Sequence, residues 1–407
     1  MKIVVNASSL LPRWTGIGQY THQVCRALRS VDGQQDYTYY YGFFSPELPR
    51  DGEGGRPGSG EQRRIAFYRG MREVVVRMPL VRRLGRDLRT AVNYGRQRLA
   101  GERYDIYFEP NSIPLPEILA RRTVTMVFDL SVLLHPEWHP ADRVRLFRRR
   151  FERGLKRTTH LLTATRYVKE QVMEHLGVPG ERISVTPISC NKEVFHERPV
   201  PAGNERLARL GVPRTYLAFV GSVEPRKNIT GLLRAYLLLP KPVREEVSLV
   251  FCGPPGWKNQ EVFQLVDRGG LRERIVWLPY LPEEEVCLLY QHALALVFPS
   301  FYEGFGLPPL EAMSAGCPVV VSDIPSHREL CGEAAEFVDP RSADDMARGM
   351  RRVCEDGAHR AELRRRGLSR AEDFSWARTA RQTLEVFREV ASGSARPPDA
   401  ASRNASR

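Results

Sequence analysis

Strand-sized apolar segments alternate with amphipathic helical segments along most of this chain, and the alternation runs through the sequence twice. At the start, KIVVNAS (2–8) has the pattern of a strand, LPRWTGIG that of a glycine-bearing loop, and QYTHQVCRALRSV (19–31) that of a helix. Further strands of the first series are expected at 105–110, 123–130, 160–164 and 182–189. Strands of the second series are expected at 215–221, 247–253, 275–279, 294–300 and 318–322. This alternation indicates an α/β fold with parallel sheets covered by helices on both faces.

The alternation restarts after a loop near 190–205, so we predict two doubly wound domains that face each other across a cleft. A length of 407 residues suits two domains of ordinary size. We place an N-terminal domain at 1–195 and a C-terminal domain at 196–375, with a helix at about 376–391 packing back on the first domain. The small, polar tail from 392 to 407 is expected to be disordered. In open α/β sheets ligands bind beyond the C-terminal strand ends.

Composition excludes several classes of protein. Hydrophobic residues make up 42% of the chain, which is enough for real cores, and no apolar run is long enough to span a membrane. The start, MKIVVNASSL, lacks the charged region and long apolar core of a signal peptide, so we expect a cytoplasmic protein. Seven scattered cysteines without paired spacing argue against a disulfide framework and against a zinc site.

The net charge of +13 is uneven, because residues 61–160 are dense in arginine. A positive surface favours anionic partners such as nucleic acid, phosphorylated substrates or an anionic membrane. No RNA-binding motif with interleaved aromatic residues is present, so no nucleic-acid partner is expected. The basic segment at 63–100 leaves two alternatives open. Its apolar face could lie on an anionic bilayer, or its valines could face the core while its arginines are solvated.

The segment FPSFYEGFGLPPLEAMSAGC (298–317) carries two carboxylates eight positions apart. A strand is expected to end at Ser300, two glycines free the backbone, and the double proline suits the first turn of a helix. The N–H groups at a helix start form an anion site, so the amides near Phe305, Gly306 and Leu307 could hold a phosphate.

The two carboxylates of this segment are expected in different places. Glu311 would lie inside the first helical turn, where it could favour the helix dipole or accept a ligand hydroxyl. Glu303 precedes the glycines, and at the mouth of the cleft it could accept hydrogen bonds from a polyol.

A second segment, FVGSVEPRKNITGLL (219–233), has a strand end, a turn at Gly221 and Ser222, and then Glu224 and adjacent cations Arg226 and Lys227 just before a helix. Adjacent Arg and Lys in such a loop are well placed for a diphosphate, whose charge grows if it is a leaving group. A solvated pair of loop cations is the alternative.

Together the two segments closely resemble the retaining, nucleotide-sugar-dependent glycosyltransferases of the GT-B fold, specifically glycosyltransferase family four. That family has a glycine turn ending in Arg-Lys-Asn, matched here at 226–228. It also has the pattern Pro-Ser-x-x-Glu-Gly-Phe-Gly-Leu-Pro-x-x-Glu-Ala-Met-x-x-Gly-x-Pro-Val-Val, matched here from Pro299 to Val320 at every fixed position. The resemblance is strongest from 215 to 330 and weaker in the first 190 residues.

The resemblance implies an acceptor-binding N-terminal domain and a donor-binding C-terminal domain. Arg226 and Lys227 would clamp the donor's diphosphate, Glu303 would contact sugar hydroxyls near the reaction centre, and Glu311 would bind the ribose. The donor-binding set that the resemblance implies comprises Gly16, Gly18, Gly221, Ser222, Tyr280, Leu281, Phe305, Gly306, Leu307 and Glu311. Within it, Tyr280 and Leu281 match the place where the base is cradled, and Gly16 and Gly18 match a glycine loop near the diphosphate and sugar.

One departure from the family lies at Phe128-Asp129-Leu130, where many relatives have His-Asp-Leu. Asp129 is retained and joins the expected catalytic set, but the histidine is not. Either the imidazole is dispensable, or His135 or His139 substitutes for it, or activity on the usual donor is altered.

No Asp-x-Asp pair occurs at the donor site, so we predict that the enzyme uses neither a metal nor another cofactor. In the mechanism proposed for the family, the acceptor hydroxyl attacks the face from which the nucleotide leaves, and the departing phosphate takes the proton. Catalysis is then mostly positioning and charge stabilisation.

The N-terminal segments DLSVLLHPEWHP and GIGQYT resemble the branch of the family that builds bacterial surface polysaccharides, many of whose members use GDP-mannose. The expected function is therefore hexosyl transfer, with mannose as the first choice and a UDP-sugar as an alternative donor. A glycan or a polyprenyl-diphosphate-linked acceptor is the expected partner. Peripheral attachment to the inner face of the cell membrane is left open as an alternative to a purely cytoplasmic location. A catalytically silent family member is the non-enzyme alternative, because of Phe128.

Overall fold

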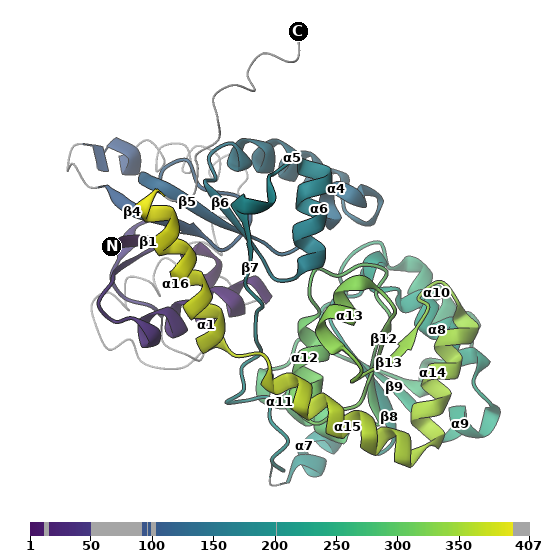
Figure 1. Ribbon diagram of the computed structural model, residues 1–407. Coiled ribbons are helices and arrows are strands. Elements are labelled where there is room, and N and C mark those ends of the chain that lie inside the picture. Colours follow the sequence, from purple (N-terminus) through teal and green to yellow (C-terminus); the bar gives the residue numbers. More distant parts are fainter. Residues whose placement is uncertain (12–15, 50–91, 96, 99–102, 201, 394–407) are drawn as a thin grey trace. The chain divides into compact units, whose positions relative to one another are not determined.

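The computed structural model describes residues 1–11, 16–49, 92–95, 97–98, 103–200 and 202–393 of the chain. These residues form two compact units (Figure 1). Unit 1 contains residues 1–128, 146–188 and the chain from Trp376 onward, and unit 2 contains residues 129–145 and 189–375. The chain therefore passes between the units at four places.

Unit 1 is built on a seven-stranded sheet in the order β3-β2-β1-β4-β5-β6-β7, parallel except at its β2–β3 edge. The strands are β1 (Lys2–Asn6), β2 (Asp36–Tyr40), β3 (Phe44–Ser45), β4 (Tyr104–Glu109), β5 (Ala120–Val127), β6 (His160–Thr163) and β7 (Ile183–Val185). The helical elements of this part of the chain are η1 (Ser8–Leu10), α1 (Gly16–Val31), α5 (Ala141–Leu155), α6 (Arg166–Leu176), η3 (Gly180–Arg182) and α16 (Trp376–Ser392). Helix α16 packs on α1 and across β4 and β5, so the last described helix lies beside the first (Figure 1).

Unit 2 is built on a six-stranded, fully parallel sheet in the order β10-β9-β8-β11-β12-β13. The strands are β8 (Tyr216–Val220), β9 (Ser248–Cys252), β10 (Ile275–Leu278), β11 (Ala295–Phe298), β12 (Val319–Ser322) and β13 (Glu336–Val338). The helices are α4 (Ser131–Leu134), η2 (Pro136–Trp138), α7 (Gly203–Arg209), η4 (Pro225–Lys227), α8 (Ile229–Leu238), α9 (Lys241–Glu246), α10 (Gln260–Arg268), η5 (Arg272–Arg274), α11 (Glu283–His292), α12 (Leu307–Ser314), α13 (Pro325–Cys331), α14 (Ala343–Glu355) and α15 (Gly357–Glu372). Central strands are buried throughout, as in the continuous apolar run VVVS of β12.

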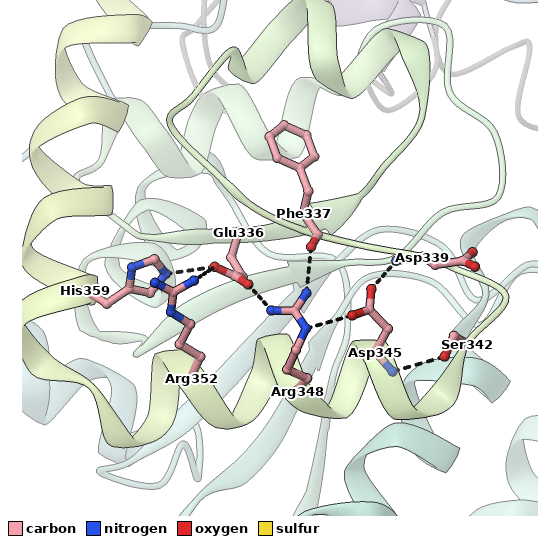
Figure 2. Close-up of polar contacts among 8 residues, drawn as sticks. All are labelled: Glu336, Phe337, Asp339, Ser342, Asp345, Arg348, Arg352 and His359. Atoms are coloured by element: carbon pink, nitrogen blue, oxygen red, sulfur yellow. Dashed lines mark hydrogen bonds and ion pairs between the residues drawn. The ribbon is translucent and has the colours of Figure 1, made fainter.

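The edge strand β13 is tied to its covering helices by one buried carboxylate (Figure 2). Glu336 receives hydrogen bonds from Arg348 at 2.5 Å, from His359 at 2.9 Å and from Arg352 at 3.2 Å. Arg348 also binds Asp345, which in turn accepts the backbone N–H of Asp339. Because Glu336 is on the strand and its partners are on α14 and α15, this network holds the sheet edge against two helices.

The prediction of parallel α/β units is confirmed, but two details differ from it. Strands β2, β3 and β13 were not predicted, because each is a short segment without a long apolar run. Residues 129–145 group with unit 2 and not with an N-terminal domain spanning 1–195. All seven cysteines are free, as predicted. No helix in the described part of the chain is long and apolar enough to cross a membrane.

Two predictions about other segments have no test in this structure. Most of the basic segment at 63–100 and the tail from 394 onward lie outside the described residues. Helix α16 itself extends to Ser392.

Candidate functional site

The strand order of unit 2 reverses direction between β8 and β11, and the two loops that follow these strands lie on either side of that point. Open α/β sheets bind ligands at such a switch point, beyond the C-terminal strand ends. The loops are joined directly, since the backbone N–H of Phe301 donates to the carbonyl of Arg226 at 2.9 Å. The two sequence segments singled out above therefore form one site.

Glycines allow the loops after β8 and β9 to lie in close contact. Gly221 has φ of 147°, and its N–H donates to Cys252 at the end of β9. A Cβ on Gly253 would lie 2.3 Å from the carbonyl oxygen of Gly221, and one on Gly256 would lie 2.3 Å from that of Val223. Both glycines also have positive φ, so larger residues there would push the two loops apart.

Glu303 lies between the two predicted cations. Its Oε2 is 2.6 Å from Arg226 Nη1, and its Oε1 is 2.6 Å from Lys227 Nζ. The Arg226 guanidinium also binds Glu224 at 2.9 Å, so the two cations are balanced by two carboxylates. Side-chain exposure is 14% for Arg226 and 9% for both Lys227 and Glu303. The cations are thus desolvated, and their electrostatic interactions with an anion are stronger than they would be at a surface.

The protonation states follow from this arrangement. Burial alone would raise the pKa of Glu303, but Arg226 and Lys227 outweigh it and hold the pKa at about 2. Burial and the neighbouring Arg226 lower the pKa of Lys227. Burial would also lower the pKa of Arg226, but Glu303, Asp129 and Glu224 together raise it. Glu303 is therefore a carboxylate, and it cannot act as a proton donor at neutral pH.

His327 on α13 supports the loop from behind. It is fully buried, its Nδ1 lies 3.1 Å from the carbonyl of Ser322, and its Nε2 has no hydrogen-bond partner among the described residues. Burial lowers its pKa to about 4, so the imidazole is neutral and donates from Nδ1. A Cβ on Gly306 would lie 3.2 Å from its Cδ2. Sequence patterns did not indicate that this histidine lies under the loop.

Helix α12 begins directly after Gly306, whose φ is 110°. Its start presents the amides near Leu307 at the same strand edge as the cations. Glu311 was expected in the first turn, but that expectation is wrong, because the helix starts at Leu307 and Glu311 is its fifth residue. The side chain accepts a hydrogen bond from Tyr290 at 3.2 Å, and burial followed by the charge of Glu283 raises its pKa to about 8.

The loop after β10 ends at the same edge of the sheet. Tyr280 is 37% exposed and Leu281 is buried. The other predicted positions of unit 2, Ser222 and Phe305, lie in the loops already described. The structure thus gathers the predicted residues of unit 2 at the C-terminal strand ends.

A segment from the N-terminal half completes unit 2. Residues 129–145, which we call the strap, are held by hydrogen bonds from Leu130 N to Tyr302 Oη (3.1 Å), from Trp257 Nε1 to the Trp138 carbonyl (2.8 Å) and from Lys258 Nζ to the Glu137 carbonyl (2.6 Å). The Trp138 ring stacks over Phe301 with centroids 6.2 Å apart. The sequence could not reveal these contacts, because they join residues more than a hundred positions apart.

The strap places Asp129 near Arg226, so that its carboxylate, like those of Glu303 and Glu224, raises the pKa of the guanidinium. It also carries the two histidines that could replace the missing imidazole. His135 stacks on Trp138 with centroids 3.9 Å apart and its Nδ1 lies 3.3 Å from the exposed Glu137. His139 is 4% exposed and feels the charges of Arg143, Glu224, Asp129 and Arg226. Of these two histidines, His139 is therefore the one buried beside the charged residues of the site.

Phe128, Gly16 and Gly18 belong to unit 1. The two glycines were expected in a loop, but helix α1 begins at Gly16 and includes both of them. The Phe128 ring packs edge-on against Tyr20 of the same helix, with centroids 4.9 Å apart. Its role in unit 1 is thus apolar packing.

Among the described residues, no group of three His, Cys, Asp or Glu side chains could hold a metal ion. The prediction of a metal-independent reaction remains untested.

Comparisons with known proteins agree with this geometry. Residues 209–370 match the family model "Glycosyl transferases group 1". Over 396 residues the chain is 33% identical to O-antigen chain mannosyltransferase B of Escherichia coli, covering 95% of this chain and 100% of that protein. It is also 30% identical over 254 residues to O-antigen chain mannosyltransferase RfbU of Salmonella typhimurium, covering 62% of this chain and 64% of that protein.

Solved structures support the fold. Sucrose-phosphate synthase from Thermosynechococcus elongatus aligns with a TM-score of 0.66 at 18% identity, covering 96% of this chain and 99% of the other. WaaG, a glycosyltransferase involved in lipopolysaccharide biosynthesis, aligns with a TM-score of 0.63 at 14% identity, covering 95% and 99%. The two parallel-sheet units thus have the GT-B fold.

Proposed function

The chain belongs to the Glycosyl transferases group 1 family, and from that premise we propose that it transfers mannose from GDP-mannose to a growing surface polysaccharide with retention of configuration. The enzyme is a glycosyltransferase of the hexosyl type. The observation that carries mannose as the sugar is the 33% identity to an O-antigen chain mannosyltransferase over that protein's whole length. A glycan or a polyprenyl-diphosphate-linked glycan is the proposed acceptor.

The site supports a reaction in which a diphosphate is the leaving group. Two buried cations stand at the switch point beside the start of α12, and both are held in place by carboxylates. We assign Arg226 and Lys227 to the donor diphosphate, where they stabilise the charge that develops as the sugar departs. Amides near Phe305, Gly306 and Leu307 add dipoles of the same sense.

Donor binding then exchanges partners within the site. The diphosphate competes with Glu303 for Lys227 and Arg226, which frees the Glu303 carboxylate to accept hydrogen bonds from sugar hydroxyls. Because Arg226 and Lys227 hold the pKa of Glu303 at about 2 in the free site, this group is already a carboxylate when the donor binds. Glu311 is assigned to the ribose and the loop at Tyr280 and Leu281 to the base.

The proton of the acceptor hydroxyl passes to the departing phosphate in this proposal. Glu303 is assigned to the sugar hydroxyls and not to this proton, and in the free site its low pKa of about 2 makes it a weak base. Catalysis would rest on positioning and on the buried cations.

Peripheral attachment to an anionic membrane is a further part of the proposal. It rests on the net charge of +13 and on the arginine-rich, apolar-interrupted sequence at 63–100. Flotation with anionic liposomes in low and high salt tests it, and failure to bind at low salt removes this part alone.

A panel of sugar nucleotides tests the donor. We expect release of GDP from GDP-mannose, and loss of that release in Lys227→Ala and Glu303→Ala. Release of UDP from a UDP-sugar instead would identify the alternative donor. Release from no donor would favour a catalytically silent member of the family.

A further inference from the structure

His139 is a buried histidine without hydrogen bonds at the edge of the proposed donor site. It follows the short helix η2 in the strap, is 4% exposed, and neither of its ring nitrogens has a hydrogen-bond partner among the described residues. A neutral imidazole has one donor and one acceptor. Burying both without partners costs free energy, so a role for this ring must be sought in a different state of the site.

The strap and the glycine loops fix the place of this ring. The Trp257 side chain donates to the carbonyl of Trp138, the residue before His139, and its ring centroid lies 6.2 Å from that of His139. One residue earlier, Gly256 lies against the backbone of Val223, which is the neighbour of Glu224. His139 is therefore held beside the loop that carries Glu224 and Arg226.

Four charged side chains act on the imidazole. They are Arg143 of α5, Glu224 and Arg226 of the loop after β8, and Asp129 at the start of the strap. Burial and then Arg143 lower the pKa of His139 below its ordinary value, so the ring is neutral at pH 7. A neutral ring can donate one hydrogen bond to a carboxylate.

Glu224 is the carboxylate that would need such a donor. It is 7% exposed, and its side chain accepts a hydrogen bond from Arg226 at 2.9 Å. A diphosphate bound to Arg226 would compete for that guanidinium and leave the buried Glu224 carboxylate without its hydrogen-bond donor. Asp129 is less dependent on a new partner, because it is only half-buried and already accepts the N–H of Ser131 at 2.8 Å.

We propose that His139 is a positioning residue that takes over the Glu224 carboxylate when the donor's diphosphate draws the Arg226 guanidinium away. This inference rests on the proposed function, in which Arg226 binds the diphosphate. The imidazole N–H donates to Glu224 in the donor-bound state, which lowers the cost of separating Arg226 from its carboxylate. His139 itself touches neither the sugar nor the diphosphate.

The proposal makes stability and binding respond in opposite ways to loss of the imidazole. In the free protein His139→Phe removes an unpaired polar group, so its melting temperature should equal or exceed that of the wild type. In the bound state the same change leaves Glu224 without its new partner, so the Kd for a nucleoside diphosphate should rise about tenfold. If His139 had only a structural role, His139→Phe would lower the melting temperature of the free protein.

The test is calorimetric titration of the full-length chain with GDP and with UDP, together with melting temperatures of the free protein. His139→Gln retains a donor and should bind more tightly than His139→Phe. In a Glu224→Gln background the His139→Phe change should have little further effect on Kd. His135→Phe is the matched control, because His135 lies in the same strap but faces the exposed Glu137, and it should leave the Kd unchanged.

Equal affinity of the wild type and His139→Phe for the nucleoside diphosphate would overturn the proposal. It would also be overturned if His139→Phe lowered the melting temperature, His139→Gln restored it, and neither variant changed the Kd. Binding of neither GDP nor UDP to the wild type would overturn both this inference and the donor site. Binding without mannosyl transfer would refute the proposed function alone, since the Kd comparison would still stand.

Discussion

Unit 2 contains two buried glutamates that each bind several cations, and they differ in where the cations lie. Glu336 is tied to Arg348, Arg352 and His359, but the two arginines are about half exposed, at 50% and 51%. Glu303 is tied to Arg226 and Lys227, which are 14% and 9% exposed. If Glu336 were removed, water could solvate its two arginines. If Glu303 were removed, its buried cations would need another anion as a partner. The cluster with buried cations is the one that we propose as the donor site.

The largest expected effect is on activity. Lys227→Ala should lower kcat by about 10²–10³-fold, because it removes a desolvated cation from the leaving diphosphate. Arg348→Ala, the matched change in the Glu336 network, should leave kcat unchanged. Steady-state kinetics with the donor identified by the panel measures both. Equal losses in the two variants would break the comparison.

The next effect is on stability. Glu303→Ala leaves two buried cations without their carboxylate and should destabilise the protein by about 3 kcal/mol, measured by urea unfolding. Glu336→Ala should cost less, because its arginines extend into water. A saturating nucleoside diphosphate should restore stability to Glu303→Ala more than to Glu336→Ala, since the phosphates supply the missing anion. A larger loss in Glu336→Ala would contradict the role of cation burial.

The dependence of stability on pH separates the two glutamates of the 298–317 segment. The pKa of Glu303 is about 2 in the folded state against 4.5 ordinarily, so its contribution is present above pH 4.5 and is lost as the pH falls toward 2. The pKa of Glu311 is raised to about 8, so its contribution is present below pH 4.5 and is lost as the pH rises through 8. Unfolding at several pH values should show that Glu303→Gln removes the first slope and Glu311→Gln the second. Unchanged slopes would mean that other groups cause them.

The smallest expected effect concerns salt. Arg348→Ala should lower the free energy of unfolding by less than about 1 kcal/mol, because Arg348 is half exposed and Arg352 and His359 still bind the Glu336 carboxylate. Raising the salt concentration to about 1 M should reduce this loss further, while the loss in Glu303→Ala should change little. Parallel salt dependence in the two variants would show that both clusters are equally solvated.

Local sequence patterns were sufficient to place the members of the Glu303 cluster in loops at one sheet edge, but not to predict the ion pairs between them. Arg226 and Lys227 follow a strand and a glycine turn, Glu303 follows another strand, and parallel strands bring their ends to one edge. The start of α12 was expected at the two prolines but lies at Leu307, because a proline is also tolerated at the second position of a helix. Glu311 is consequently the fifth residue of the helix, just beyond its first turn.

Contacts between distant segments could not be predicted from local patterns. The strap was assigned to the N-terminal domain by its position in the sequence, and only hydrogen bonds such as that from Leu130 to Tyr302 place it in unit 2. The unpaired nitrogens of His139 and His327 depend in the same way on surroundings contributed by several elements. The sequence drew attention to His139 only through the missing histidine at 128.

The pairing of α1 with α16 has a consequence for the order in which the protein is made. On the ribosome the N-terminal part of a chain ordinarily folds first. Here unit 1 needs the helix that starts at Trp376, so its sheet remains uncovered on that side until almost the whole chain has emerged. Unit 2, whose last residue is Ser375, has all its parts available earlier. The half of the protein that is synthesised first is therefore the half that is finished last.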